Sequence, residues 1–439
     1  DLATYYMGSW EDGALKTGWQ KITVYDEEKD DDYDYWFNFK SNGEKRKHGE
    51  DAKGDILEKK INGKYYGFDN RGVMTYEWTI ATGSGDGSTA SNWRYFNSPE
   101  DGARSTKGWF KVVAPDADGD DNTFKDYGTG STFAKGDAED ENERWYYADS
   151  DGELYVGQIK KIKGKYYGFA PEGNKAGSML TGLCALTVDK DGNIVKLWDR
   201  DMDSDSLDDA LKGEGDFKDF GKSSFDTLYY FGNNEDSDGA LKTGNVTINL
   251  DGDSYQFQFS KTGGAEGKGR GVNGIDDGKY IYKFGQKIKA GSDDKYIVVY
   301  ADGDTGSTGV NVHKIDTATL RSDYSASIGQ NKDGDSVNYV GTLGELASGK
   351  LTSNYYLVNT SGAIVKNKTA AKDGNDWYFY VDEKVIKMYT NNNTLNDSKD
   401  YPNANLTALK KNWDNTKYVV NNGKTVPTTP NDDLIDDGI

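Results

Sequence analysis

The chain has 439 residues, of which 35% are hydrophobic and 54 are glycine, so it has too few apolar side chains for a large buried core of ordinary composition. Its 53 basic and 74 acidic residues give a net charge of −21, and we expect no nucleic-acid partner, because phosphate binding needs a cationic face. No apolar run approaches the roughly 18 residues of a membrane-spanning helix, so we expect no membrane span.

The first element along the chain is an opening segment with paired aromatic residues, an acidic turn and Gly-Trp, at residues 5–19. It is echoed at residues 95–109, and a third copy at residues 229–245 ends in Gly-Asn instead of Gly-Trp. Each opening is followed by an aromatic strand and a turn, at residues 35–43, 145–152 and 255–263. Alternating aromatic residues that end at a glycine turn predict short, half-buried β-strands.

A decapeptide, KKINGKYYGF at residues 59–68, returns 101 positions later as KKIKGKYYGF at residues 160–169. Its central turn residues, flanked by alternating apolar and aromatic residues, predict a β-hairpin. A hairpin that recurs at long intervals indicates stacked units rather than one continuous core. We expect turns at Asn62-Gly63, Asn42-Gly43, Lys163-Gly164 and Asp151-Gly152.

The predicted fold is therefore all-β, a repetitive β-hairpin solenoid with irregular acidic insertions. The insertions, residues 26–34 and 114–144, are expected on the outside of the stack, because burying their charge would carry a heavy desolvation cost. The chain divides into super-repeat 1 (1–88), super-repeat 2 with long insertions (89–225), super-repeat 3 (226–350), a degenerate super-repeat 4 (351–425) and a tail (426–439).

Helix is predicted at only two places. One is near residues 205–212, where Asp205 or Ser206 could cap, and the other is near residues 405–413, where Asn405 could cap.

Metal and catalytic sites are not predicted. Acidic loops at residues 116–121 and 199–205 have the alternate carboxylates that can wrap Ca²⁺, but neither has the glutamate at position twelve of an EF-hand. Solvated loops are the preferred interpretation, and calcium is the alternative. His48, His313 and Cys184 are too few ligands for zinc.

No nucleophile elbow or phosphate loop is present in the sequence, and no carboxylate pair stands out as a glycosidase dyad. Cys184 lies in the most apolar stretch and is expected to be buried and inert. We therefore expect no catalytic residues, no cofactor and no enzymatic activity.

The units from Gly18-Trp19 to Gly43 and from Gly108-Trp109 to Gly152 resemble the cell-wall-binding repeats, of the choline-binding type, of Gram-positive surface proteins. Similar repeats occur in glucan-binding glucosyltransferases and in the tails of clostridial toxins. The resemblance covers most of residues 1–300. It implies a left-handed solenoid whose aromatic side chains form cages for choline on teichoic acids or lie against sugar rings. The cage residues that it implies are Trp19 with Trp36 and Tyr66, and Trp109 with Trp145 and Tyr167.

Two interpretations of these rings stay open. Aromatic faces around a quaternary ammonium gain cation–π attraction, and aromatic platforms also accept the apolar faces of sugars. Alternatively, the same rings fill the core between stacked hairpins.

The function that we expect is a non-catalytic, extracellular bacterial protein, at the cell surface or secreted, that binds cell-wall teichoic acid or glycan through aromatic clusters between repeats. One alternative is a self-assembling structural subunit that packs against copies of itself in a surface layer or fibre. Another is the anchoring region of a cell-wall hydrolase or adhesin. The chain begins at Asp1 without methionine, so we expect a processed or trimmed protein from which any secretion signal has already been removed.

Overall fold

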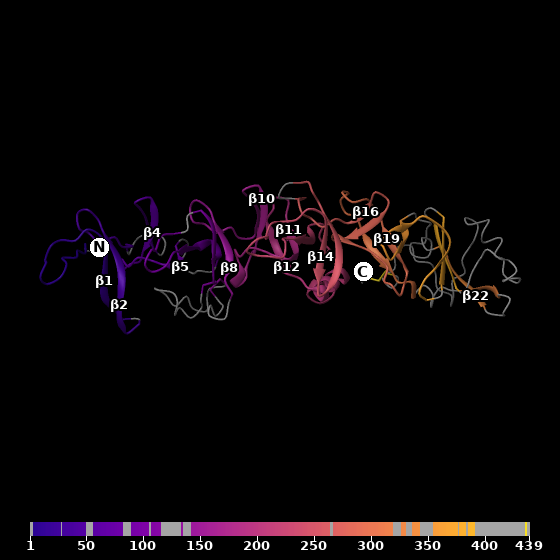
Figure 1. Ribbon diagram of the computed structural model, residues 1–439, viewed down its shortest axis with the longest axis horizontal. Helices are drawn as coiled ribbons and strands as arrows, with labels where there is room; N and C mark the ends of the chain where they lie inside the picture. Colours follow the sequence, from indigo (N-terminus) through magenta and orange to yellow (C-terminus); the bar gives the residue numbers. More distant parts are fainter. Residues whose placement is uncertain are drawn as a thin grey trace. The chain divides into compact units, whose positions relative to one another are not determined.

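The structure is a computed structural model that describes residues 3–27, 29–49, 56–81, 89–104, 107–115, 133–134, 142–263, 267–318, 326–330, 336–342, 354–375, 377–382, 385–390 and 435–436. Among these residues the regular structure is almost entirely β-strand, with one α-helix (Figure 1). The expected all-β hairpin fold is confirmed. In the part of the chain described, no helix is long and apolar enough to cross a membrane.

The chain forms two compact units, of which unit 1 comprises Asp1–Gly182, Val188–Leu197 and Phe231–Leu241. Unit 1 is built from successive two-stranded antiparallel hairpins. They are β1 (Gly18–Asp26) with β2 (Asp31–Phe39), β3 (Leu57–Ile61) with β4 (Lys64–Phe68), β5 (Glu77–Ile80) with β6 (Trp93–Phe96), β7 (Gly108–Val112) with β8 (Arg144–Ala148), and β9 (Gln158–Ile162) with β10 (Lys165–Phe169).

Each of these hairpins is followed by the same return. The chain turns after the second strand and forms a single antiparallel bridge to that strand's last residue, and this recurs in all five hairpins. The bridges join Phe39 to Lys45, Phe68 to Met74, Phe96 to Arg104, Ala148 to Leu154, and Phe169 to Met179. A hairpin with its return is therefore the repeating unit, and the last residue of each second strand gives a common reference position for comparing repeats.

The predicted turns are turns, but two of them have a different place. Asn62 and Gly63 have φ of 49° and 86° and join β3 to β4, and Lys163-Gly164 joins β9 to β10 in the same way. Positive φ at both central residues is the hairpin turn whose twist matches that of the flanking strands. Asn42-Gly43 and Asp151-Gly152 lie instead in the returns after β2 and β8.

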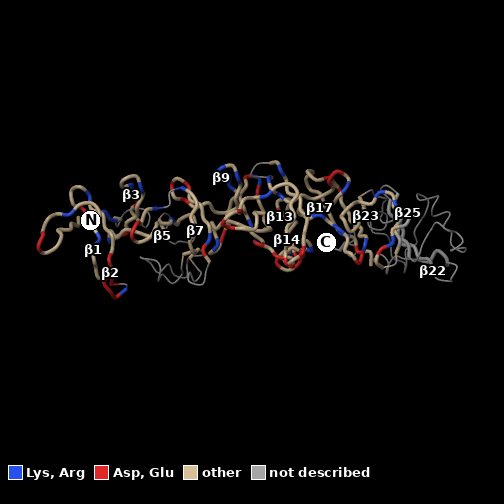
Figure 2. The backbone as a smooth tube through the Cα atoms, in the orientation of Figure 1, with Lys and Arg blue, Asp and Glu red and all other residues tan. Residues whose placement is uncertain are grey.

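The segment at residues 26–34 is a hairpin end rather than an irregular insertion, because β1 and β2 pair up to Asp26 and Asp31. Figure 2 shows the acidic residues gathered at that end of the hairpin. Most of the segment is exposed, as expected, but Asp26 is only 2% exposed. It is buried because its carboxylate accepts hydrogen bonds from the Tyr35 hydroxyl (2.7 Å) and Arg71 Nη1 (3.0 Å).

The expectation that residues 114–144 lie wholly outside the stack is wrong. Ala114 is buried, and Phe133 and Ala134 are fully buried at 0% exposure. Residues 116–132 and 135–141 lie outside the described residues. Phe133 and Ala134 are buried because moving an apolar side chain out of water is favourable in free energy, even when its neighbours in the sequence are charged.

Unit 2 comprises Leu183–Thr187, Trp198–Tyr230 and Lys242–Ile439, and its sheets are larger. β11 (Leu183–Val188) pairs with β13 (Asp226–Tyr230), and β12 (Ile194–Asp199) lies between them in the sequence. One five-stranded sheet has β14 (Gly244–Leu250), β15 (Asp253–Phe259), β18 (Gln286–Lys287), β17 (Tyr280–Lys283) and β16 (Gly274–Asp276), in that order.

Two further five-stranded sheets lie in the rest of unit 2. Their orders are β24 (Ile364–Val365), β23 (Tyr355–Asn359), β19 (Tyr296–Ala301), β20 (Val312–Ile315), β28 (Ile435–Asp436), and β21 (Ala326–Gln330), β22 (Ser336–Thr342), β27 (Val385–Thr390), β26 (Trp377–Asp382), β25 (Asn367–Lys372).

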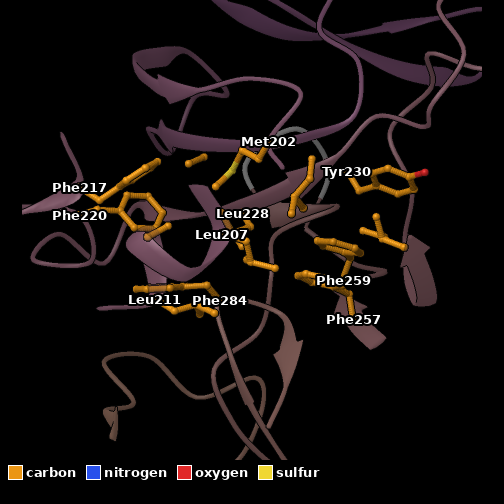
Figure 3. Close-up of a cluster of buried hydrophobic side chains, with 14 residues drawn as sticks. Met202, Leu207, Leu211, Phe217, Phe220, Leu228, Tyr230, Phe257, Phe259 and Phe284 are labelled. Carbon is orange, nitrogen blue, oxygen red and sulfur yellow. The ribbon is translucent and has the colours of Figure 1, made fainter. Parts of the chain in front are cut away.

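The predicted helix near residue 205 is confirmed as α1 (Ser204–Lys212), but its cap is Asp203, not Asp205 or Ser206. The Asp203 carboxylate accepts a hydrogen bond from the Ser206 amide at 2.8 Å, which satisfies one of the free amides of the first turn. The buried face of α1 packs in an aromatic and aliphatic cluster (Figure 3). The helix predicted near Asn405 lies outside the described residues.

Cys184 on β11 is buried as predicted. Burial raises the pKa of its thiol to about 12, so the thiol stays protonated and unreactive at neutral pH.

Candidate functional site

The first three predicted site residues meet in unit 1, and we call them cluster 1. Trp19 is the second residue of β1, and Trp36 on β2 lies opposite Lys21. Since side chains alternate along a strand, the two indoles share one face of the hairpin. Their ring centroids are 6.5 Å apart with the planes at 83°. Tyr66, from β4 of the next hairpin, lies 4.7 Å from Trp19 at 61°.

Cluster 2 brings together the other three predicted residues with the same design. Trp109 is the second residue of β7, and Trp145 on β8 lies opposite Lys111. The indole centroids are 6.3 Å apart at 86°. Tyr167, from β10, lies 4.9 Å from Trp109 at 70°. The predicted grouping of both sets of residues therefore matches the structure.

Each cluster rests on a buried phenylalanine. Phe68 lies 5.7 Å from Trp19 at 30°, and Phe169 lies 5.7 Å from Trp109 at 29°. Both phenylalanines have 0% exposure, whereas the six residues of clusters 1 and 2 are all half-buried. Trp19 and Trp109 thus pack on a buried ring, while the six residues of the two clusters keep part of their surface in solvent. Their burial is intermediate between that of core residues and that of surface residues.

Sequence reasoning missed a carboxylate that braces each cluster. Glu100 accepts a hydrogen bond from Trp36 Nε1 (3.1 Å) and pairs with Lys21 Nζ (2.8 Å). The lysine contact, with the indole hydrogen bond, holds the pKa of Glu100 below its usual value. The indole of Trp36 is therefore fixed in orientation by a residue 64 positions away.

Asp236 plays the same part in cluster 2. Its Oδ1 accepts from Trp145 Nε1 (2.9 Å) and from Lys111 Nζ (2.8 Å), and these two contacts lower its pKa. Glu235 also pairs with Lys111 at 2.9 Å. Both braces belong to the acidic turn of an opening segment, which the repeats identify, but nothing local links either turn to its tryptophan.

Among the described residues, the third opening forms no cluster of this kind, because Asn245 stands in place of tryptophan at the second residue of β14. Within the described ranges, no three His, Cys, Asp or Glu side chains gather as metal ligands. Of the two acidic loops, residues 116–121 lie outside the described residues, and the other supplies the Asp203 cap of α1.

Comparisons with known proteins give a likeness of fold. No family model and no curated protein matches the chain. Among solved structures, CbpF in complex with ipratropium is 16% identical, with 88% of this chain and 89% of that chain covered and a TM-score of 0.36.

CbpJ from Streptococcus pneumoniae TIGR4 is 15% identical, with 84% and 99% covered and a TM-score of 0.31. Alternansucrase in complex with isomaltononaose is 14% identical, with 85% of this chain but 17% of that chain covered and a TM-score of 0.20. CbpF is a choline-binding protein, so solved structures similar to this chain, at low identity, include a protein of the type that its repeats resemble. The case for a function rests on the geometry of this chain's own clusters.

Proposed function

We propose that this chain is a non-catalytic binding protein of the bacterial cell surface, and that clusters 1 and 2 bind side groups of a cell-wall polymer. The observation that carries the proposal is the repetition of one geometry. The three ring-to-ring distances of cluster 1 differ from those of cluster 2 by at most 0.2 Å. Both clusters are half-exposed, and in both a carboxylate accepts a hydrogen bond from one indole. Core packing by itself requires neither feature.

A quaternary ammonium group suits this geometry. The planes of the two indoles lie at 83° with centroids 6.5 Å apart, and we call the space beside both rings the corner. A cation there can lie within about 6 Å of both centroids, the distance over which cation–π attraction acts. The tyrosine supplies a third ring. Because Glu100 and Asp236 hold one indole of each corner in place, little side-chain entropy is lost on binding.

A sugar ring is the second candidate ligand, because indole faces also accept the apolar C–H face of a sugar. The corner shape favours the ammonium group, since a sugar needs one uncovered face and gains little from a second face perpendicular to it. The similar structures with ipratropium and isomaltononaose make both classes reasonable probes. Placement outside the cell, attachment to teichoic acid and the four super-repeats are parts of the same proposal.

The test is a titration of the purified chain with choline and, separately, with isomaltotriose, followed by tryptophan fluorescence. We expect choline to quench the wild-type signal, and the double variant W19A/W109A to lose most of the response. Trp198→Ala is the matched control, because Trp198 is half-buried but belongs to unit 2 and to neither cluster. An unchanged choline affinity in a folded W19A/W109A protein would refute the proposal, and a response to isomaltotriose alone would transfer it to glycans.

A further inference from the structure

A third aromatic group in unit 1 occupies the same strand positions as clusters 1 and 2. Trp78 is the second residue of β5, as Trp19 is of β1. Trp93 on β6 lies opposite Ile80, two residues beyond Trp78. This is the register that places Trp36 opposite Lys21. Hairpin β5–β6 therefore carries both indole positions.

The next hairpin supplies the tyrosine position. Tyr146 stands two residues before Ala148, the last residue of β8, which bridges to Leu154. Tyr66 stands in the same way two residues before Phe68. The ring centroids of Trp78 and Tyr146 are 5.1 Å apart at 78°, close to the values of 4.7 Å and 4.9 Å in clusters 1 and 2.

This third group, cluster 3, is filled by a ring from another segment. Phe133 lies 5.3 Å from Trp78 at 88° and 5.5 Å from Trp93 at 71°. It comes from the acidic segment between β7 and β8. Exposure is 4% for Trp78 and 0% for Trp93, Tyr146 and Phe133, so cluster 3 is closed where clusters 1 and 2 are half-exposed.

Phe133 does not replace the phenylalanine on which the other clusters rest. The planes of Phe68 and Phe169 lie at 30° and 29° to Trp19 and Trp109. The equivalent strand position in cluster 3, the last residue of β8, is Ala148. Phe133 is instead nearly perpendicular to Trp78 and also contacts the second indole. Its ring therefore lies beside both indoles, as the ligand is proposed to do in clusters 1 and 2.

The surroundings of cluster 3 are apolar at the positions where clusters 1 and 2 have lysine. Ile80 takes the place of Lys21 and Lys111, and Phe110 lies opposite Tyr146, where Lys59 lies opposite Tyr66 and Lys160 opposite Tyr167. The site can therefore close without burying a lysine, which would carry a large desolvation cost. A dry aromatic corner is also where cation–π attraction is strongest.

We propose that Trp78, Trp93 and Tyr146 form a third ligand site and that Phe133 is its built-in occupant. With the ring in place the chain offers two open sites, and with the ring removed a quaternary ammonium group binds in the third. The ligand class rests on the proposed function, but the third site can be tested independently of the other two.

The experiment counts choline molecules bound per chain by equilibrium dialysis with radiolabelled choline. We expect two for the wild type and three for Phe133→Ala. Phe96→Ala is the matched control, because Phe96 is equally buried, at 0% exposure, but is not a ring of cluster 3, and it should bind two. A folded Phe133→Ala protein that binds the same number as the wild type would overturn the inference.

The outcomes separate the two proposals. If the wild type binds no choline and Phe133→Ala binds one, ligand binding at clusters 1 and 2 is refuted and the third site is supported. If neither protein binds choline, both proposals are refuted. If Phe133→Ala folds poorly, choline should raise its unfolding midpoint more than that of Phe96→Ala, because an additional ligand stabilises the native state by mass action. If Phe133→Ala does not fold at all, Phe133→Leu is used instead, because it keeps an apolar side chain at this position. Binding of a third choline, with lower affinity, would support the inference, and binding of only two would overturn it.

Discussion

Arg104 is expected to hold the turn that carries Glu100 against the hairpin that carries Tyr66. Its side chain is 5% exposed, and Nη1 donates to Glu58 Oε2 and to the Asp151 carbonyl oxygen, both at 2.6 Å. The guanidinium carbon lies 4.3 Å from the Tyr65 ring centroid. One cation therefore joins β3, β4 and the return after β8.

The expected cost of Arg104→Ala follows from these contacts. Removing one partner of a buried ion pair costs about 3–5 kcal/mol, and a desolvated cation–π contact is worth about 2 kcal/mol. These terms overlap rather than add, and Glu58 is 24% exposed, so its charge is partly solvated after the change. We expect a loss of about 3 kcal/mol in the free energy of unfolding of unit 1.

Urea unfolding followed by tryptophan fluorescence measures this loss, because most tryptophans of the described residues lie in unit 1. Lys64→Ala is the control, since its pair with Asp101 (3.5 Å) is exposed and should contribute under about 1 kcal/mol. A double-mutant cycle with Glu58→Gln should give a coupling of at least about 1 kcal/mol. A loss below about 1 kcal/mol for Arg104→Ala, or a coupling near zero, would show that Arg104 does not clamp the repeats.

Three further outcomes are expected. The pKa values of Glu100 and Asp236 are lowered, so both carboxylates stay ionised and bonded to their indoles above the usual carboxyl pKa, and these contacts are lost as pH falls through the lowered values. Wild-type tryptophan emission should therefore change only below about pH 4. The E100Q/D236N variant should show no such transition. Cys184, with its thiol pKa raised to about 12, should resist thiol reagents at pH 8 until the protein is unfolded, and modification of the native chain would contradict its burial. Gly168→Ala should destabilise unit 1 by about 1–3 kcal/mol, because an added Cβ would lie 2.7 Å from the Phe231 ring; a wild-type unfolding midpoint would count against this packing.

The resemblance to choline-binding-type repeats implied the residues of the first two aromatic clusters, and local rules account for part of their geometry. Alternation along a strand and the antiparallel register place Trp19 and Trp36 on one face, and the turn at Asn62-Gly63 fixes the hairpin that carries Tyr66. The repeated decapeptide places Tyr167 in its second copy as Tyr66 lies in the first. The cap of α1 was misplaced by two or three residues, since several acidic and hydroxyl side chains there could each accept the same amide.

What the sequence by itself determined is the hairpin repeat and the shared face of Trp19 and Trp36, because these depend on pairing between the two strands of one hairpin. Only the tertiary structure decided that Glu100 accepts a hydrogen bond from Trp36, 64 residues away. It also decided that Phe133, from an acidic segment, packs against Trp78 and Trp93. Those pairings depend on how successive hairpins stack. An acidic turn or a lone phenylalanine carries no local signal of its distant partner, and burial selects that partner only once the repeats are packed together.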